Sequence, residues 1–229
     1  MAGPPPNWLD ATDRQRVSDA VAAAEAESAG EIVTILAERS DSYNDVALAW
    51  AAIVAVTALI VISLWPDFYL AKLAWISGHW NAEWTLAHAF AIAAFVAALK
   101  FAGTWLLLLW TPLKFLLVPR WIKAARVHAR AVTAFRIGAE RRTQGRTGIL
   151  IYLSMREHRA EIVADEAIAS RVDPEVWGHA MAAMLAHLRE GRVAEGMCAA
   201  VEQVGAVLAV HLPRAADDAN ELPDRLIEL

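Results

Sequence analysis

The chain has 229 residues, of which 57% are hydrophobic and 21% are charged, with a formal net charge of −5 and a single cysteine, Cys198. Disordered chains are poor in apolar residues and nucleic-acid binders are usually basic. This composition therefore excludes an unstructured protein and predicts no nucleic-acid partner. One cysteine excludes an intrachain disulfide framework and a cysteine-based zinc finger. The length suits one domain, or one domain with an insertion.

Residues 1–45 predict one helix followed by one strand. Asp10 is a candidate N-cap, and Gly30 is a natural end for the helix. The β-branched run from Glu31 to Leu36 is typical of a strand. A helix and one strand cannot form a core, so this piece needs partners from later in the chain. The N-terminus lacks a basic region followed by an apolar region, so we expect no signal peptide.

Residues 46–119 predict a transmembrane hairpin. The stretch from Val46 to Trp65 holds 20 residues without a charge, about the length that a helix needs to cross ~30 Å of hydrocarbon. The alternative is a buried core helix, but apolar residues cover the whole circumference rather than one stripe. A second apolar run predicts a span at about 86–111. The residues between the spans, rich in aromatic side chains at Phe68, Tyr69, Trp75, Trp80 and Trp84, predict a loop on the membrane surface.

Two lysines stand out in the second apolar run. We expect Pro112 to end or kink the helix, with residues 112–119 leaving the membrane and Lys114 extending to the headgroups. Lys100 would lie near mid-depth, where a cation is costly. It either faces the other span or lies nearer an interface than this boundary suggests. An ion relay would need an acidic partner, and neither predicted span offers one.

The distribution of lysine and arginine predicts the orientation. The segment 66–85 has only Lys72, whereas Arg120, Lys123, Arg126 and Arg130 follow the second span closely. Cytoplasmic flanks carry such an excess, so we expect a multi-pass protein of a bacterial inner (plasma) membrane with both termini cytoplasmic. Lys123, Arg126 and Arg130 have two interpretations: a topology signal with salt bridges, or contacts to lipid headgroups.

Residues 120–213 predict the remainder of the soluble domain. Helices are expected over 121–139, with an apolar stripe at Trp121, Ala125, His128, Val132, Phe135 and Ala139, after Asp173-Pro174 up to Gly191, and from Val193 to before Pro213. Strands are expected at 148–153 and 160–165, and residues 214–229 as a tail. Strand 30–37 must join strand 148–154 to have a partner, which requires an even number of spans between them. The prediction is an α/β fold: a small mixed sheet with helices packed on it, interrupted by the two-helix hairpin.

Several segments of the sequence together resemble one known protein family. SAGEIVTILAERS (28–40), RTGILIYLSMREHRAEIVAD (146–165), VWGHAMAAMLAHLREGRVAEGMCAAVEQVGAVLAVHLP (176–213) and NELPDRLIEL (220–229) are similar to bacterial membrane proteins with a TPM domain. The resemblance implies a compact α/β sandwich. Some members, in plant thylakoids, are described as acid phosphatases, and some bind a divalent metal through carboxylates. Phosphatase activity would follow here by fold analogy alone.

The residues themselves offer an incomplete catalytic set. We single out no catalytic residue, because no nucleophile or phosphate-binding motif occurs. Asp165 and Glu166, which follow a predicted strand end, are the best candidate metal pair, with Ca²⁺ or Mg²⁺ as the suited cofactor. The alternative is a solvated loop. Cys198 beside Met197 is interpreted as a core residue.

We therefore predict an integral membrane protein that displays a cytoplasmic TPM-type domain as a binding or accessory module. The expected partners are the bilayer and a membrane protein; the oligomeric state stays open. The alternative is a metal-dependent phosphatase-like hydrolase acting at the membrane surface, so whether the chain is an enzyme also stays open. An assay for metal-dependent turnover separates the two.

Overall fold

The computed structural model describes residues 8–77, 85–138, 147–214 and 224–229. It divides into two compact units, Met1–Asp41 with Arg120–Leu229, and Ser42–Pro119. We call the first the α/β unit and the second the hairpin unit, and describe each by itself.

The α/β unit is built on a four-stranded mixed sheet with strand order β3-β2-β1-β4. β1 pairs in parallel with β2, in a register that runs from Glu31 opposite Gly148 to Ala37 opposite Ser154. β3 is antiparallel to β2, and β4 is parallel to β1. The predicted joining of the first strand to residues 148–154 is thus confirmed. The described elements of this unit are α1 (Ala11–Glu25), β1 (Glu31–Ala37), α6 (Arg120–Gly138), β2 (Gly148–Ser154), β3 (Arg159–Ala164), α7 (Glu166–Ala169), α8 (Pro174–Leu188), α9 (Val193–His211) and β4 (Ile227–Glu228).

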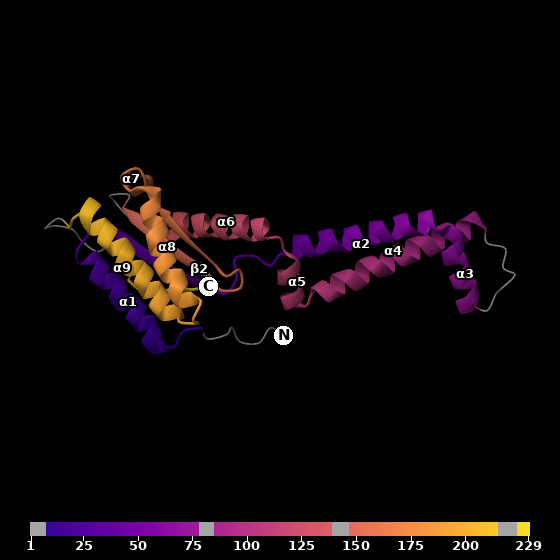
Figure 1. The fold of residues 1–229 in the computed structure, drawn as a ribbon, viewed down its shortest axis with the longest axis horizontal. Coiled ribbons are helices and arrows are strands. Elements are labelled where there is room, and N and C mark those ends of the chain that lie inside the picture. Colours follow the sequence, from indigo (N-terminus) through magenta and orange to yellow (C-terminus); the bar gives the residue numbers. More distant parts are fainter. Residues whose placement is uncertain (1–7, 78–84, 139–146, 215–223) are drawn as a thin grey trace. The chain divides into compact units, whose positions relative to one another are not determined.

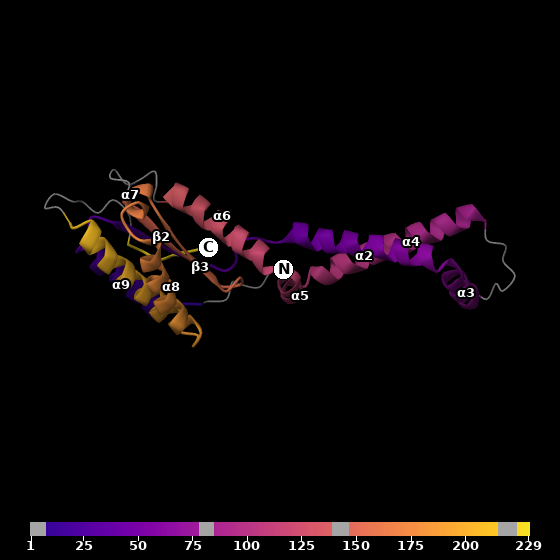
Figure 2. The ribbon, with the colours of Figure 1, turned by 45° about the horizontal axis from the view of Figure 1, so that its top comes forward.

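Helices cover both faces of this sheet (Figures 1 and 2). Side chains alternate along a strand, so Ile32 and Leu36 pack with α1, α8 and α9, whereas Val33 and Ile35 pack with α6. Every residue of β1 and β2 is buried, as expected of parallel strands with helices on both faces. The unit is therefore a three-layer α/β sandwich, and the predicted fold class is confirmed.

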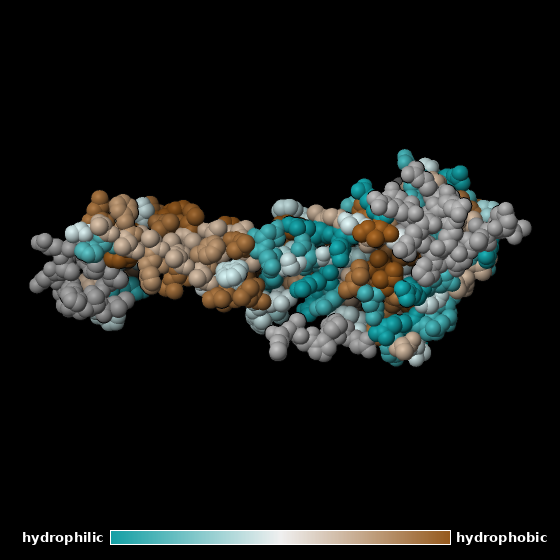
Figure 3. Space-filling model, turned by 180° about the vertical axis from the view of Figure 1, so that it is seen from behind, coloured by the Kyte–Doolittle hydropathy of each residue, from teal (hydrophilic) through white to brown (hydrophobic). Residues whose placement is uncertain are grey.

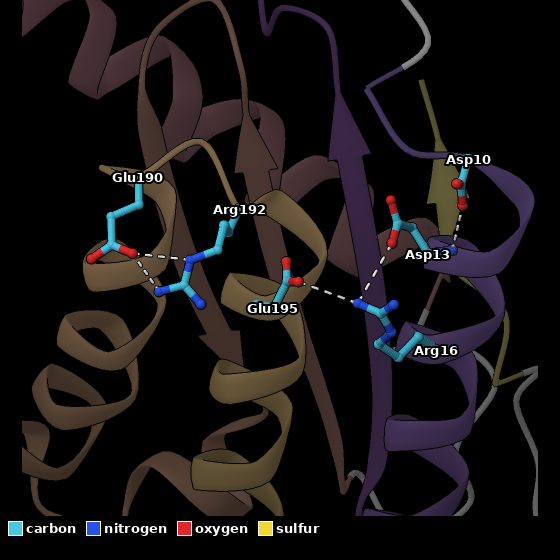
Figure 4. Close-up of polar contacts among 6 residues, drawn as sticks. All are labelled: Asp10, Asp13, Arg16, Glu190, Arg192 and Glu195. Atoms are coloured by element: carbon cyan, nitrogen blue, oxygen red, sulfur yellow. Dashed lines mark hydrogen bonds and ion pairs between the residues drawn. The ribbon is translucent and has the colours of Figure 1, made fainter.

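The layer of α1 and α9 depends on close approach of two backbones. A Cβ atom added to Gly205 of α9 would lie 2.6 Å from the Cβ of Ala24 in α1. Such a distance is below van der Waals contact, so only glycine fits here. Polar contacts on the surface join the same helices: Arg16 lies 3.3 Å from Glu195 and 3.6 Å from Asp13, and the Asp13 amide donates to the Asp10 N-cap (Figure 4). These side chains are exposed, so the burial of α9 carries more of the stability than the ion pairs do.

Three details of the α/β unit differ from the sequence prediction. The buried stripe of α6 is Val127, Ala131 and Phe135, while Trp121 is 73% exposed. Alanine and valine occupy both candidate stripes, so periodicity alone could not separate them. α1 ends at Glu25, before Gly30. The predicted tail contains β4, which is held by backbone hydrogen bonds, among them Leu229 N to Leu36 O (3.0 Å); a two-residue strand has no hydrophobic pattern to detect.

A buried carboxyl group lies where α1 ends and β1 begins. Glu25 is 7% exposed, and its Oε1 accepts the amide of Ile32 at 2.7 Å. Burial raises the pKa of Glu25 from 4.5 to about 8; the Ile32 hydrogen bond opposes this shift, and the nearby carboxylates Glu31 and Asp224 add to it. Asp224 belongs to the C-terminal segment that leads to β4, so protonation of Glu25 removes the repulsion between these two carboxylates.

The hairpin unit consists of α2 (Asn44–Leu64), α3 (Pro66–Ser77), α4 (Leu86–Leu108) and α5 (Thr111–Leu117). α2 and α4 pack against each other, with Ala47 and Ala51 buried at their contact; small residues allow such close approach of apolar helices. Many large apolar side chains of this unit are exposed, and the face drawn in Figure 3 is largely hydrophobic over α2 and α4. α3 corrects the prediction of a surface loop over residues 68–80, as far as residue 77. Trp80 and Trp84 lie outside the described residues.

Polar groups at one end of the hairpin unit are bonded to each other. α4 ends at Leu108 and α5 begins beside Pro112, so the predicted break is confirmed. Lys114 is only 7% exposed, and its Nζ donates to Asn44 Oδ1 at 3.0 Å. This corrects the expectation that Lys114 extends to headgroups. Tyr43 packs edge-on against Phe115, with ring centroids 5.2 Å apart.

Three described helices are long and apolar enough to cross a bilayer: α2, α4 and α9. α9 differs from the other two because nine of its residues are buried in the core of the α/β unit. α2 buries two residues and α4 only Leu108. Lys100 lies at the helical spacing of the partly covered Ala97 and Thr104, on the side of α4 that packs against α2, although its own side chain is exposed.

The pKa of Glu25 predicts a pH dependence of folding. Between about pH 4.5 and about pH 8 the native state keeps a proton that the unfolded chain releases. Stability should therefore fall as pH rises through this window, by at most about 1.4 kcal/mol per pH unit. Glu25→Gln mimics the protonated form and should remove that slope in urea titrations of the full chain in detergent, followed by circular dichroism. Glu27→Gln, at an exposed neighbour in sequence, is the matched control; an unchanged slope in Glu25→Gln would refute the assignment.

Candidate functional site

A groove of about 500 Å³ lies between α6 and the β3–α7 connection. Phe135 and Val163 form part of its apolar floor, and Arg136, Asp165 and Glu166 bring charge to it. The remaining lining residues are Val132, Ala164, Ala167 and Ser170. It contains the predicted metal pair, and the two carboxylates are adjacent because β3 ends at Ala164 and α7 begins at Glu166.

One oxygen of the Asp165 carboxylate takes part in hydrogen bonding that holds the fold. It is 6% exposed, and its Oδ2 accepts the Gly148 amide at 3.1 Å, while the Asp165 amide donates to Gly148 O at 3.0 Å. These bonds fix the first residue of β2 beside the end of β3. Asp165 therefore has a structural role that does not require a metal, although its other oxygen is not part of these bonds.

Glu166 is exposed beside Asp165, and Ser170 Oγ donates to the carbonyl of Ala167. Arg136 supplies a cation on the α6 side of the groove. Within the described ranges, no group of three His, Cys, Asp or Glu side chains could hold a metal ion. Ca²⁺ takes six to eight oxygen ligands, so Asp165 and Glu166 would need donors from solvent or ligand. The groove suits binding of a small polar group better than a closed metal cage.

A second polar cluster lies at the carboxyl ends of β1 and β2. Ser40 Oγ lies 3.1 Å from Tyr152 Oη and donates to Ser154 Oγ at 3.0 Å. Ser154 Oγ in turn donates to Glu157, whose other oxygen accepts the Ser40 amide at 3.0 Å. Tyr152, Ser154 and Glu157 are buried. Burial raises the pKa of the Tyr152 phenol, while the hydrogen bond with Ser40 and the charge of Arg130 lower it.

Sequence reasoning missed this cluster. In α/β sheets, ligand-binding groups gather at the carboxyl ends of parallel strands, and Ser40 and Ser154 each follow or end such a strand. That signal could have found them. Their burial and mutual hydrogen bonds assign them a structural role: they join the loop after β1 to the turn after β2.

Ion pairs surround the same sheet edge. Arg126 Nη1 lies 2.6 Å from Asp41 Oδ2, and Arg156 lies 2.9 Å from Glu38. Of the three residues predicted to contact headgroups, Arg126 thus has a protein partner and Arg130 a hydrogen bond with Tyr152. Lys123 is half-buried. These contacts favour the salt-bridge interpretation for Arg126, and the headgroup contact stays a prediction.

Comparisons with known proteins agree with the fold. The family model of the TPM domain matches residues 115–207. A solved structure with a similar fold is the BA42 protein of the psychrophilic bacterium Bizionia argentinensis, with a TM-score of 0.55 and 17% sequence identity over 96% of this chain and 95% of that one. At this identity the likeness concerns the fold alone. No curated protein matches the chain significantly.

The buried role of Glu157 is testable. Glu157→Ala leaves the Ser40 amide and Ser154 hydroxyl without their acceptor, which should cost about 2–3 kcal/mol of stability. Glu157→Gln keeps an acceptor oxygen and should cost about 1 kcal/mol. Cys198 is the only cysteine and is half-buried in α9, so pulsed thiol labelling of the full chain in urea reports unfolding of this unit.

Glu190→Ala is the matched control for this measurement, because Glu190 is exposed and pairs only locally with Arg192 (Figure 4). It should change stability by less than about 0.5 kcal/mol. An equal effect of the Glu157 and Glu190 variants would contradict the network.

Proposed function

Because residues 115–207 carry a TPM domain, we propose that this chain is an integral membrane protein that displays the domain as a binding module on the cytoplasmic face of a bacterial inner membrane. The observation that carries the proposal is the exposure of α2 and α4. Two helices of 21 and 23 residues leave most of their apolar side chains uncovered. Water would disfavour this surface, whereas hydrocarbon about 30 Å thick matches it.

The sheet supports the same topology. β1 precedes the hairpin unit and β2 follows it, yet the two strands are hydrogen-bonded neighbours. Both must lie on one side of the membrane, which an even number of crossings provides. α2 and α4 supply two crossings, and α3, with 12 residues, is too short to add a third. The basic residues at the start of α6 favour the cytoplasm for that side.

Binding, rather than catalysis, is supported by the groove. Its only carboxylate pair is Asp165 and Glu166 among the lining residues, and Asp165 also holds Gly148. Arg136 beside these acids gives the groove both signs of charge. On α6, Lys123, Arg126 and Arg130 follow the hairpin unit directly in sequence, where anionic headgroups would attract them.

Insertion and orientation are tested by reporter fusions. A reporter at residue 75, in α3, should behave as periplasmic, and one after residue 229 as cytoplasmic.

Extraction with alkaline carbonate should leave the full chain in the membrane pellet. Replacing two apolar residues of α4 with charged ones, Phe95→Asp and Leu99→Asp, should release it, whereas Trp121→Asp on exposed α6 should not. A soluble full chain, or reversed reporters, would defeat this proposal.

The second candidate function is a metal-dependent phosphatase. The observation that favours it is the open carboxylate of Glu166 beside Asp165 in the groove. The purified full chain in detergent is assayed with a chromogenic phosphate ester and Ca²⁺ or Mg²⁺, then with a chelator. We expect no chelator-sensitive turnover. Turnover lost in Glu166→Gln or Asp165→Asn but kept in Glu175→Gln, at an exposed acid of α8, would establish the phosphatase instead.

A further inference from the structure

We infer that the groove where α2, α3 and α4 meet is a site for an anionic phospholipid, which places an acyl chain among apolar side chains and its phosphate beside Lys72. The inference rests on the proposed function, because a lipid reaches this groove only where α2 and α4 cross the bilayer. It adds to that function a lipid class and a binding site outside the α/β unit.

The groove lies within the hairpin unit and has a volume of about 160 Å³. Its lining is apolar except for Tyr69 and Lys72, and the other lining residues are Ile62 of α2, Pro66 and Leu70 of α3, and Ala89, Ile92 and Val96 of α4. An apolar cavity of roughly 150 Å³ holds a molecule the size of benzene. This groove therefore accommodates a stretch of hydrocarbon chain of about that size. Left empty, its lining would lose dispersion contacts that a lipid chain restores.

The groove runs from the level of the headgroups into the hydrocarbon. α2 has 21 residues, and at 1.5 Å per residue it spans about 32 Å, which matches ~30 Å of hydrocarbon. α3 begins at Pro66, directly beyond that span, and Figures 1 and 2 show it turned out of the direction of α2 and α4. α3 thus lies at the membrane boundary. Val96 is ten residues after the start of α4 at Leu86, about 15 Å deeper.

The polar groups of the groove both belong to α3, at its headgroup end. In the part of the chain that the structure describes, neither the Lys72 ammonium nor the Tyr69 hydroxyl has a hydrogen-bond or ion-pair partner. α3 contains one acidic residue, Asp67, which is five residues before Lys72 and therefore on another side of the helix. An ammonium and a phenol hydroxyl are both donors to phosphate oxygens, and the charged donor makes the stronger bond.

The size and chemistry of the groove distinguish a phospholipid from other occupants. An inorganic phosphate ion would pair with Lys72 but leave the apolar lining uncovered. A transmembrane helix is about 10 Å across with its side chains, so it could insert no more than a single side chain into this volume. An acyl chain joined to a phosphate matches the apolar lining and the cation together.

The headgroup is tested by native mass spectrometry of the full chain in a neutral detergent. Dioleoyl phosphatidylglycerol and dioleoyl phosphatidylcholine have the same acyl chains and differ in net charge. Lys72→Leu should lower the ratio of their affinities about fivefold, because one lysine near an anionic headgroup contributes about that factor. Lys100→Leu removes the same charge from α4 at a residue that does not line the groove, so it is the matched control and should leave the ratio unchanged.

The acyl chain is tested by filling the groove. Ala89→Phe adds a ring to the lining and should remove the bound lipid of either class, since the ring occupies the volume that the chain needs. Ala91→Phe, at an exposed alanine of the same helix that does not line the groove, is the matched control and should keep the lipid. Glycerol 3-phosphate, which has the phosphate without a chain, should not displace the lipid at equal concentration.

Three results overturn the inference: an unchanged ratio in Lys72→Leu, an equal change in Lys100→Leu, or lipid that remains bound in Ala89→Phe. Displacement by glycerol 3-phosphate would also overturn it, as would a dimer that Ala89→Phe dissociates, because a second copy would then fill the groove. Carbonate extraction before purification separates failures. A chain that washes off the membrane refutes the proposed function and the inference with it, whereas an inserted chain without this lipid binding refutes the inference alone.

Discussion

The parallel pairing of β1 with β2 is the constraint on which the other features depend. Seven backbone positions of β1, from Glu31 to Ala37, face seven of β2, although the whole hairpin unit separates them in sequence. β1 has no other neighbour of comparable length among the described strands, since β4 pairs with it over two residues. The α/β unit therefore forms only when the chain returns after residue 119 to the place that it left at residue 41. If the hairpin unit enters a bilayer, the chain must therefore leave the bilayer again on the side where it entered.

Apolar content alone does not determine where a helix lies in this protein. α9 and α4 both have the length and hydropathy of a membrane span, but α9 meets a surface that fits it. Gly205 admits Ala24, and Gly30 lies against Leu208, where an added Cβ would come within 2.8 Å. Together with the packing of α8, these contacts cover α9, so its apolar atoms leave water without a bilayer. α4 packs mainly against α2, and of its described residues only Leu108 is buried. α9 and α4 therefore differ in how closely the neighbouring elements pack against them.

The sequence was sufficient to predict an element where several residues follow one pattern or where the backbone requires a particular residue. The strands β1 and β2 and the helix α9 are confirmed because each follows a pattern of several residues, and the start of α8 is confirmed because Pro174 suits the first position of a helix. It was insufficient for β4, which is held by main-chain bonds, and for the α6 stripe, where Val127 and Val132 are equivalent in composition. The groove brings Asp165 and Glu166 together as adjacent residues must, but the bond from Gly148 to Asp165 depends on tertiary structure.

Lys114 and Lys100 carry the same charged group in the hairpin unit, but their surroundings differ. Lys114 comes after the break at Pro112, where α5 turns back and the Asn44 side chain is available as an acceptor. Lys100 lies within a continuous helix, where every backbone carbonyl nearby is already used by the helix itself. At spacings of three and four from Ala97 and Thr104, Lys100 lies on the same side of α4 as these partly covered residues, yet its own side chain stays exposed. In the part of the chain that the structure describes, the hairpin unit thus provides a side-chain acceptor for Lys114 and none for Lys100.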